Sequence, residues 1–270
     1  MAVIALAGGP GAPGVTTTAL ALLLAWPLQV GRRVILAECD PDGGAVLAGA
    51  LAGRTPGPYG LRNLAVADRQ GQLGEAFWRQ LIDLSDEGTD RLLLPGLTDP
   101  AQASSLAYTW EKLAALFAGI ERTNPSHDVI VDLGRSGAFG ASAPLARKAD
   151  AVLMVVRPTL RGIHAAQPRI RALRADLEEA GTGADALGIV VVDHGMYSVS
   201  EVSQQLGTPV IMRLPHSPQA AAVLSDGHEA GRGFKRSDLL RASRSGADQI
   251  LQHVRGRRAR LMLGEHAHAR

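Results

Sequence analysis

The sequence predicts an α/β fold, in which one doubly wound, mostly parallel sheet carries helices on both faces. Two observations support this prediction. Short apolar segments recur along the 270 residues, and several are continuous rather than alternating, such as VIAL, VLMVV and IVVV. Continuous apolar segments are typical of strands buried on both faces, as in parallel sheets. Longer segments with helical character separate them, and this alternation is typical of doubly wound α/β domains.

The elements follow one another in a regular order. The predicted strands are Val3–Ala7, Arg33–Ala37, Arg91–Leu94, Asp128–Val131, Ala151–Val156, Leu187–Val192 and Val210–Arg213. The predicted helices are Thr16–Gln29, Leu73–Leu84, Ser104–Ile120, Pro168–Ala180, Ser200–Leu206 and Ser237–Leu263. Two Gly-containing segments, Arg54–Gly60 and Asp226–Gly233, are predicted as loops. We expect residues 1–263 to form a single domain and residues 264–270 to form a frayed C-terminal tail.

Composition narrows the class of protein. Hydrophobic residues make up 46% and charged residues 20% of the chain, which favours a globular fold over disorder. The net charge of +2 does not require nucleic acid as a partner. Cys39 is the only cysteine, which excludes an intrachain disulfide and a cluster bound by several cysteines of one chain. We see no basic leader and no apolar run of the roughly 18 residues that span a bilayer, so we expect a cytoplasmic protein.

The first motif lies between the first predicted strand and the first predicted helix. GPGAPGVT, residues 9–16, matches the phosphate-binding pattern G-x-x-x-x-G-K-[ST] at every defined position except the lysine, where Val15 stands. Glycines let backbone N–H groups surround phosphate oxygens, and the helix N-terminus adds partial positive charge. Thr16 stands where a hydroxyl would bind Mg²⁺. The alternative is a turn that only joins strand to helix. The glycines of this loop are Gly9, Gly11 and Gly14.

Acidic residues end two further predicted strands. ECDPDGG, residues 38–44, places Asp40 just after the second strand, and HDVIVDLG, residues 127–134, ends an apolar strand at Asp132. Carboxylates at a strand's carboxyl end near a phosphate loop can hold Mg²⁺, directly or through water, or can orient an attacking water. The alternatives are an acidic turn bent by Pro and Gly around Asp40, and an aspartate that caps a turn at Asp132.

The last two predicted strands also end in polar residues. VVVDH, residues 190–194, and LPHSP, residues 214–218, contribute Asp193 and Pro215. In a doubly wound sheet both segments open on the crevice at the carboxyl ends of the strands, where ligands bind. They are therefore candidates for a pocket that holds a nucleotide base, although ordinary loops at strand ends remain the alternative.

Taken in order, these segments resemble the MinD/ParA family of P-loop ATPases over nearly the whole chain. The resemblance implies a P-loop NTPase fold of the SIMIBI type that binds ATP or ADP with Mg²⁺. Asp40 would orient the hydrolytic water and bind the metal, and Asp132 would act through the metal. Asp193 stands where many members have an adenine-reading Asn, and Pro215 where the backbone lines the base. The loop residues implied to contact phosphate and Mg²⁺ are Gly9, Gly11, Gly14, Val15, Thr16 and Thr17.

The loop also departs from the family. Its members carry two lysines here, and this sequence has Pro10 and Val15 at those positions. Phosphoryl transfer depends on neutralising the charge that develops on phosphate oxygens, so the loss of one positioned cation costs roughly 10²-fold or more in rate. The resemblance thus implies weak or absent hydrolysis. The nearby cations that are candidates to compensate are Arg135, Arg157 and Arg161.

Divergent members of the CpaE/TadZ type, found in pilus and secretion systems, often have altered loops and act as localisation factors. By this analogy we expect a dimeric, nucleotide-responsive switch or localisation factor for a secretion, pilus or partition machine. A pseudo-ATPase scaffold that binds protein partners without nucleotide is one alternative, and a ParA-like DNA-binding partition protein is another. The predicted C-terminal helix faintly resembles the membrane helix of MinD, but Arg258 interrupts its apolar face, and we prefer an ordinary packed helix.

Overall fold

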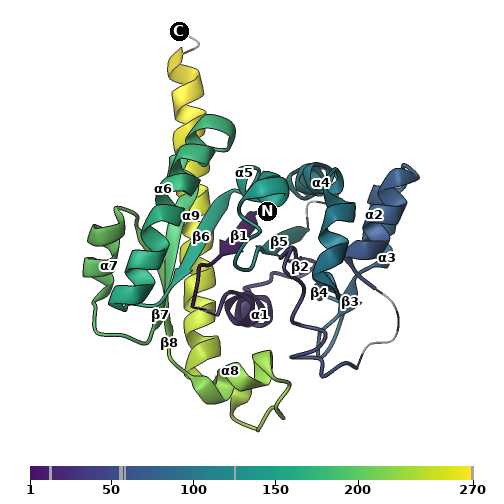
Figure 1. Ribbon diagram of the computed structural model, residues 1–270, viewed down its shortest axis with the longest axis horizontal. Coiled ribbons are helices and arrows are strands. Elements are labelled where there is room, and N and C mark those ends of the chain that lie inside the picture. The colour runs from purple at the N-terminus through teal and green to yellow at the C-terminus, as the bar shows by residue number, and fades with distance from the viewer. Residues whose placement is uncertain (12–13, 55–56, 58, 125, 269–270) are drawn as a thin grey trace.

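The computed structural model describes residues 1–11, 14–54, 57, 59–124 and 126–268. It contains an eight-stranded sheet of order β3-β4-β2-β5-β1-β6-β7-β8 (Figure 1). Every neighbouring pair is parallel except β3–β4, which is antiparallel. The strands are β1 (Val3–Ala7), β2 (Arg33–Glu38), β3 (Ile82–Asp83), β4 (Arg91–Leu94), β5 (His127–Asp132), β6 (Ala151–Val156), β7 (Leu187–Asp193) and β8 (Val210–Pro215).

Helices cover both faces of this sheet, as predicted. The α-helices are α1 (Val15–Ala25), α2 (Leu61–Arg69), α3 (Leu73–Arg79), α4 (Thr109–Thr123), α5 (Ala143–Arg147), α6 (Leu160–Ala180), α7 (Val199–Leu206), α8 (Pro218–Ser225) and α9 (Asp238–His268). The 3₁₀ helices are η1 (Pro100–Leu106), η2 (Gly140–Ser142), η3 (Ala184–Ala186) and η4 (Phe234–Arg236).

Two hydrophobic cores flank the sheet because successive side chains of a strand point to opposite faces. In β1, Val3 and Ala5 belong to the core beneath α2 to α7, whereas Ile4 and Leu6 belong to the core beneath α1, α8 and α9. The central strands are therefore buried on both faces. The predicted motifs lie at the carboxyl ends of these strands.

Two predicted helices are wrong in part. The predicted helix Leu73–Leu84 ends at Arg79, and Ile82–Asp83 instead pairs with β4 at the edge of the sheet. The predicted helix Ser104–Ile120 is a 3₁₀ helix up to Leu106, and α4 then runs Thr109–Thr123. The 3₁₀ segment begins at Pro100, where the Asp99 side chain accepts a hydrogen bond from the N–H of Ala101.

Other differences concern helix boundaries. Helix α6 begins at Leu160 rather than at Pro168, because the Thr159 side chain caps it by accepting the N–H of Gly162. Helix α1 ends at Ala25, before the predicted Gln29. The sequence analysis missed α2, α5 and α8, and it predicted none of η2, η3 and η4. The predicted loop Arg54–Gly60 lies partly outside the described residues, whereas Asp226–Gly233 is a loop.

The C-terminal helix α9 continues past Leu263 to His268 and extends beyond the body of the molecule (Figure 1). The frayed tail expected at residues 264–270 stays a prediction, as does the domain boundary at 263. Within the described residues, no helix has both the length and the apolar character that crossing a membrane requires.

Candidate functional site

The glycine-rich loop leaves the carboxyl end of β1 and leads directly into α1. Gly14 is the N-cap of α1 and has a left-handed backbone (φ +93°), which favours glycine. Gly11 is also left-handed (φ +99°), and no described atom lies within 4 Å of a Cβ placed at either position. The space over the first turn of α1 is thus open to a ligand, and the N–H groups of that turn can bind it. Ala12 and Pro13 lie outside the described residues.

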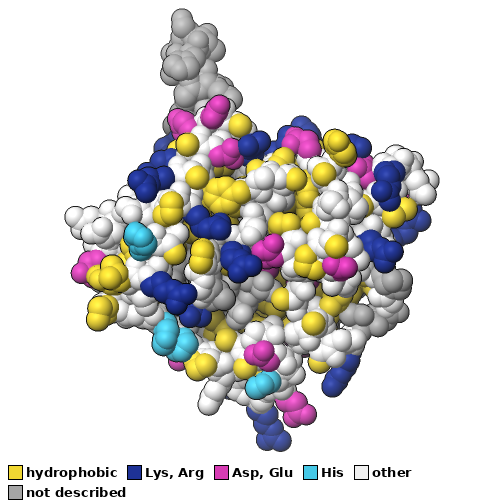
Figure 2. Space-filling view, viewed as in Figure 1, with side chains coloured by type: hydrophobic (Ala, Val, Ile, Leu, Met, Phe, Trp, Pro, Cys, Tyr) yellow, Lys and Arg dark blue, Asp and Glu magenta, His cyan; other side chains and the backbone are white. Residues whose placement is uncertain are grey.

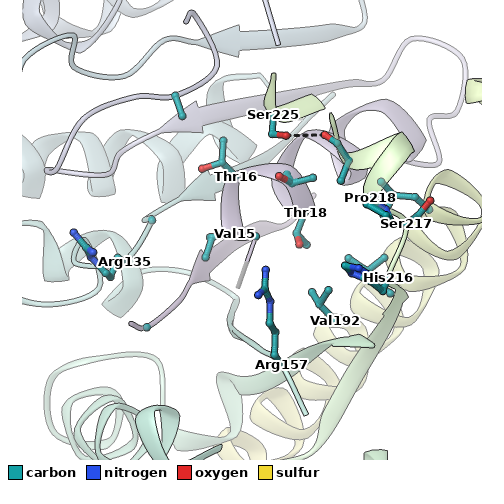
Figure 3. A pocket seen from close by; sticks show the side chains of 18 of the residues that line it. Val15, Thr16, Thr18, Arg135, Arg157, Val192, His216, Ser217, Pro218 and Ser225 are labelled. Carbon is teal, nitrogen blue, oxygen red and sulfur yellow. Dashed lines mark hydrogen bonds between the residues drawn. The ribbon is translucent and has the colours of Figure 1, made fainter. Parts of the chain in front are cut away.

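A cavity of about 520 Å³ lies beside this loop. Such a volume is typical of small-molecule sites, which run from roughly 300 to 1,000 Å³. Its walls come from the start of α1, the segments that follow β2 and β5, and the segment from β8 into α8 (Figure 3). Of the residues implied by the resemblance, those that line the cavity are Gly9, Gly14, Val15, Thr16, Thr17 and Asp40.

Thr16 and Asp132 meet at the base of this site. Asp132 ends β5 with 2% of its surface exposed, and its Oδ1 accepts the N–H of Gly134 at 2.8 Å. The Thr16 side chain lies next to the same carboxylate. Burial, together with a smaller effect of the neighbouring Glu38 and Asp40 carboxylates, raises the pKa of Asp132 to about 7. The Thr16 side chain favours the charged form of this carboxylate and so acts to lower its pKa.

Asp40 is fixed by the segment that follows β5. Its Oδ2 accepts the N–H of Arg135 at 3.3 Å, and its Oδ1 accepts the N–H of Asp42 at 3.0 Å. Burial raises the pKa of this carboxyl group as well. Arg135 also pairs with Asp42 at 3.3 Å, so the segments after β2 and β5 are tied together. The two predicted aspartates therefore belong to one site.

The oxygen donors of this site suit Mg²⁺. A threonine hydroxyl and two carboxylates are hard ligands, and Mg²⁺ in nucleotide sites is held by few protein groups together with phosphates and waters. Among the residues that the structure describes, no group of three or more His, Cys, Asp or Glu is arranged to hold a metal ion alone. The donor set therefore fits a metal that arrives with a phosphate ligand.

Glu38 is a buried carboxylate of this site that the sequence analysis did not single out. It ends β2 with 2% of its surface exposed and accepts the N–H groups of Ala45, Val46 and Gly96 at 2.8, 2.9 and 3.1 Å. Burial raises its pKa. These contacts fix the segment that follows Asp40. The available signal was a carboxylate at the end of an otherwise apolar strand.

The residues predicted to hold a base are only partly in the cavity. Asp193 and Pro215 end β7 and β8 beside the cavity rather than among its described lining residues, and Asp193 pairs with Arg213. The side chains of Val192 and Leu214 line it instead, together with His216. The His216 ring stacks on His194 with centroids 4.0 Å apart, at the same carboxyl-end edge of the sheet.

The two loop positions that lack lysine differ in their surroundings. Val15 is 7% exposed and packs into the core beneath α1, and Pro10 is exposed at the surface of the loop. Cys39 is fully buried between the acidic strand ends, and burial raises its thiol pKa well above the ordinary value. A thiol of this kind is protonated and unreactive at neutral pH.

Comparisons with known proteins bear on the fold. No family model matches the chain, and no curated protein matches it. Solved structures do: a ParA family ATPase from Chlorobium tepidum shares 17% identity and a TM-score of 0.67, covering 91% of this chain and 97% of that one. The chain has the MinD/ParA fold.

Two MinD structures extend the comparison. The MinC:MinD cell division protein complex of Aquifex aeolicus matches with 18% identity and a TM-score of 0.67, covering 93% of this chain and 96% of that chain. The septum site-determining protein MinD of Pyrococcus horikoshii, complexed with Mg-ADP, matches with 16% identity and a TM-score of 0.65, covering 92% and 95%. The predicted P-loop NTPase architecture is confirmed, and the CpaE/TadZ branch stays a prediction.

In the MinD/ParA fold of this chain, the cavity lies where the order of the sheet reverses. Strand β1 has β5 on one side and β6 on the other, and the chain turns from β1 into the glycine-rich loop at that point. Crevices at such reversal points are the usual ligand sites of doubly wound sheets.

Proposed function

We propose that the protein binds ATP or ADP with Mg²⁺ in the cavity beside α1 and that the bound nucleotide controls its assembly. The observation that carries this proposal is the contact of Thr16 with Asp132 at the N-terminus of α1, beside a cavity of about 520 Å³. Hydroxyl, carboxylate and open backbone N–H groups are the parts that a Mg²⁺-phosphate ligand requires.

Each residue of the site would have its own role in binding the nucleotide and Mg²⁺. Thr16 and Asp132 would hold Mg²⁺, and Asp40 would bind it through water or orient an attacking water. The metal supplies positive charge to the phosphates when it is bound. Hydrolysis is slow or absent in this proposal, because Val15 and Pro10 replace the two cations that would neutralise charge as it develops.

Calorimetric titration tests nucleotide binding. Wild-type protein is titrated with ATP and with ADP, each with Mg²⁺, beside the variants Thr16→Ala and Thr89→Ala. Thr89 is exposed and precedes the amino end of β4, whereas the cavity lies at the carboxyl ends of the strands, so Thr89 is a matched control. We expect micromolar binding to the wild type and to Thr89→Ala, and at least tenfold weaker binding to Thr16→Ala. Absence of wild-type binding at millimolar nucleotide would refute the proposal.

The proposed biological role follows from the control of assembly by bound nucleotide. We propose that the protein forms a homodimer when ATP is bound and positions a secretion, pilus or partition machine in the cytoplasm through a protein partner. A MinD with this fold forms a complex with MinC, which makes a protein partner reasonable here. Light scattering after gel filtration tests the dimer: twice the monomer mass with ATP and Mg²⁺, but not with ADP, is the expected result.

A scaffold that binds partners without nucleotide is the second candidate, and the buried Val15 favours it. At the position of the lysine, this side chain packs into the core and supplies no charge for a phosphate. Partner binding that is indifferent to ATP would support this candidate. DNA binding has less support, because basic and acidic side chains alternate over the described part of the face in Figure 2.

A further inference from the structure

We propose that Arg157 supplies the positive charge to the phosphates of the bound nucleotide, in place of the lysine that the loop lacks. This inference rests on the proposed nucleotide binding. It addresses a specific deficit: a phosphate loop needs a cation near the outer phosphates, and neither Pro10 nor Val15 can provide one.

The topology brings Arg157 to the loop. It directly follows β6, which pairs in parallel with β1. Ala7, the last residue of β1, lies opposite Met154 near the end of β6. Arg157 lines the large cavity together with Val15 and Thr16. It also lines a smaller cavity of about 140 Å³ with Gly9, Pro10 and Gly11. Arg157 thus lies beside both sides of the loop.

The side chain points in the required direction. In Figure 3 the guanidinium group extends from the end of β6 toward the first turn of α1, between Val15 and Thr18. If the phosphates of a ligand bind the N–H groups of that turn, they would lie between the N-terminus of α1 and this guanidinium. A planar guanidinium can form paired hydrogen bonds to phosphate oxygens.

The backbone around Arg157 is tightly fixed. Its carbonyl accepts the N–H of Thr159 at 2.8 Å, and a Cβ at Gly162 would lie 2.4 Å from the same oxygen. A Cβ at Gly195 would lie 2.0 Å from the carbonyl oxygen of Pro158. Because α6 and the segment after β7 both pack closely on this turn, the backbone from which the Arg157 side chain extends is held in place.

The other two candidate arginines are less suited. Arg135 lines the large cavity, but its guanidinium pairs with Asp42, and in Figure 3 it lies away from the start of α1. Arg161 is exposed and lines only the smaller cavity, beside Pro10 and Gly11. Arg157 alone of these three lines both cavities.

The test compares nucleotide affinity across charge variants. ATP, ADP and adenosine are titrated with Mg²⁺ into the wild type, Arg157→Gln, Arg157→Lys and the control Arg171→Gln, which removes an exposed arginine from α6. We expect Arg157→Gln to weaken ATP binding at least tenfold and adenosine binding less than threefold. Arg157→Lys retains most of the ATP affinity, and Arg171→Gln retains all of it. Circular dichroism establishes folding, and Arg157→Met replaces the Gln variant if that variant is unfolded.

Three outcomes would overturn the inference. If the wild type binds ATP and Arg157→Gln binds it equally well, Arg157 does not contact phosphate, while the proposed nucleotide binding stands. If Arg157→Gln loses ATP and adenosine alike, the side chain supports the pocket rather than the phosphates. If the wild type binds neither ATP nor ADP, this inference and the proposed function fail together.

Discussion

Gly134 shows how closely the segments that follow β2 and β5 are packed at the candidate site. It follows β5 with a left-handed backbone (φ +54°), and a Cβ at this position would lie 1.6 Å from Oδ2 of Asp40. Only a glycine lets the Asp40 carboxylate approach the main chain and accept the N–H of Arg135. The position of the Asp40 carboxylate therefore depends on the absence of a side chain at Gly134.

Substituting Gly134→Ala should destabilise the protein more than Gly140→Ala does. Gly140 is also left-handed (φ +67°), but no described atom lies within 4 Å of its Cβ position, so this variant measures backbone strain alone. We expect Gly140→Ala to lower the free energy of unfolding by about 1 kcal/mol. Gly134→Ala should lower it by about 2–4 kcal/mol, because Asp40 also loses hydrogen bonds. Urea unfolding measures both, and equal losses would contradict the packing argument.

Sequence reasoning identified the candidate site residues that belong to local sequence patterns. Thr16, Asp40 and Asp132 each follow a recognisable strand or loop pattern, and the structure brings them together. Sequence reasoning did not find Glu38, whose role depends on the N–H groups of residues 45 and 46 and on that of the distant Gly96. Nor could it anticipate that Asp193 pairs with Arg213, because that contact requires the neighbouring strand in register.

At the scale of elements, α6 contains a proline that the sequence analysis took as its first residue. Proline is favoured in the first turn of a helix, which made Pro168 a reasonable start. The actual start is set by the Thr159 cap, and Pro168 lies exposed in the helix interior. Tertiary structure also overrides the local pattern at Ile82–Asp83. This segment forms a strand because it pairs with β4.

Replacing Pro168 should therefore stabilise the protein. Alanine at this position restores an N–H for the carbonyl of His164 and removes a poor helix former, worth about 1–3 kcal/mol. The exposed neighbour Gln167 provides the control, since Gln167→Ala changes no backbone hydrogen bond. We expect chemical denaturation to show a higher free energy of unfolding for Pro168→Ala only. A loss of stability in Pro168→Ala would mean that α6 requires the proline for its packing.

For the whole molecule, the sequence predicted the layers but not the strand order. Alternating apolar and helical segments are sufficient to predict a doubly wound sheet, because the burial of both faces appears within each strand. The order β3-β4-β2-β5-β1-β6-β7-β8 depends on pairings between distant segments, which no local pattern encodes. The same is true of α9, whose helical character was predicted but whose packing against β8 and α1 was not.

Helix α9 closes the second core and pairs with two acidic residues, Asp150 just before β6 and Asp185 in η3 before β7. Ile250 and Val254 are buried, with 0% and 3% exposed surface. The nearly buried guanidinium of Arg257 contacts Asp185 at 2.7 Å, and Arg258 contacts Asp150 at 2.8 Å. This half of α9 is therefore part of the folded core.

Truncation should separate this half of α9 from the segment beyond it. Ending the chain after Gly246 removes Ile250 and Val254, each worth about 1.5–3 kcal/mol of burial, and leaves Asp185 without Arg257. We expect the midpoint of thermal unfolding to fall by roughly 10–20 °C or the protein to aggregate. Ending it after Arg260 keeps these contacts and should shift the midpoint by less than about 3 °C. Circular dichroism melts of both truncations measure this difference. If both melt alike, α9 is an appendage, and the second core is complete without it.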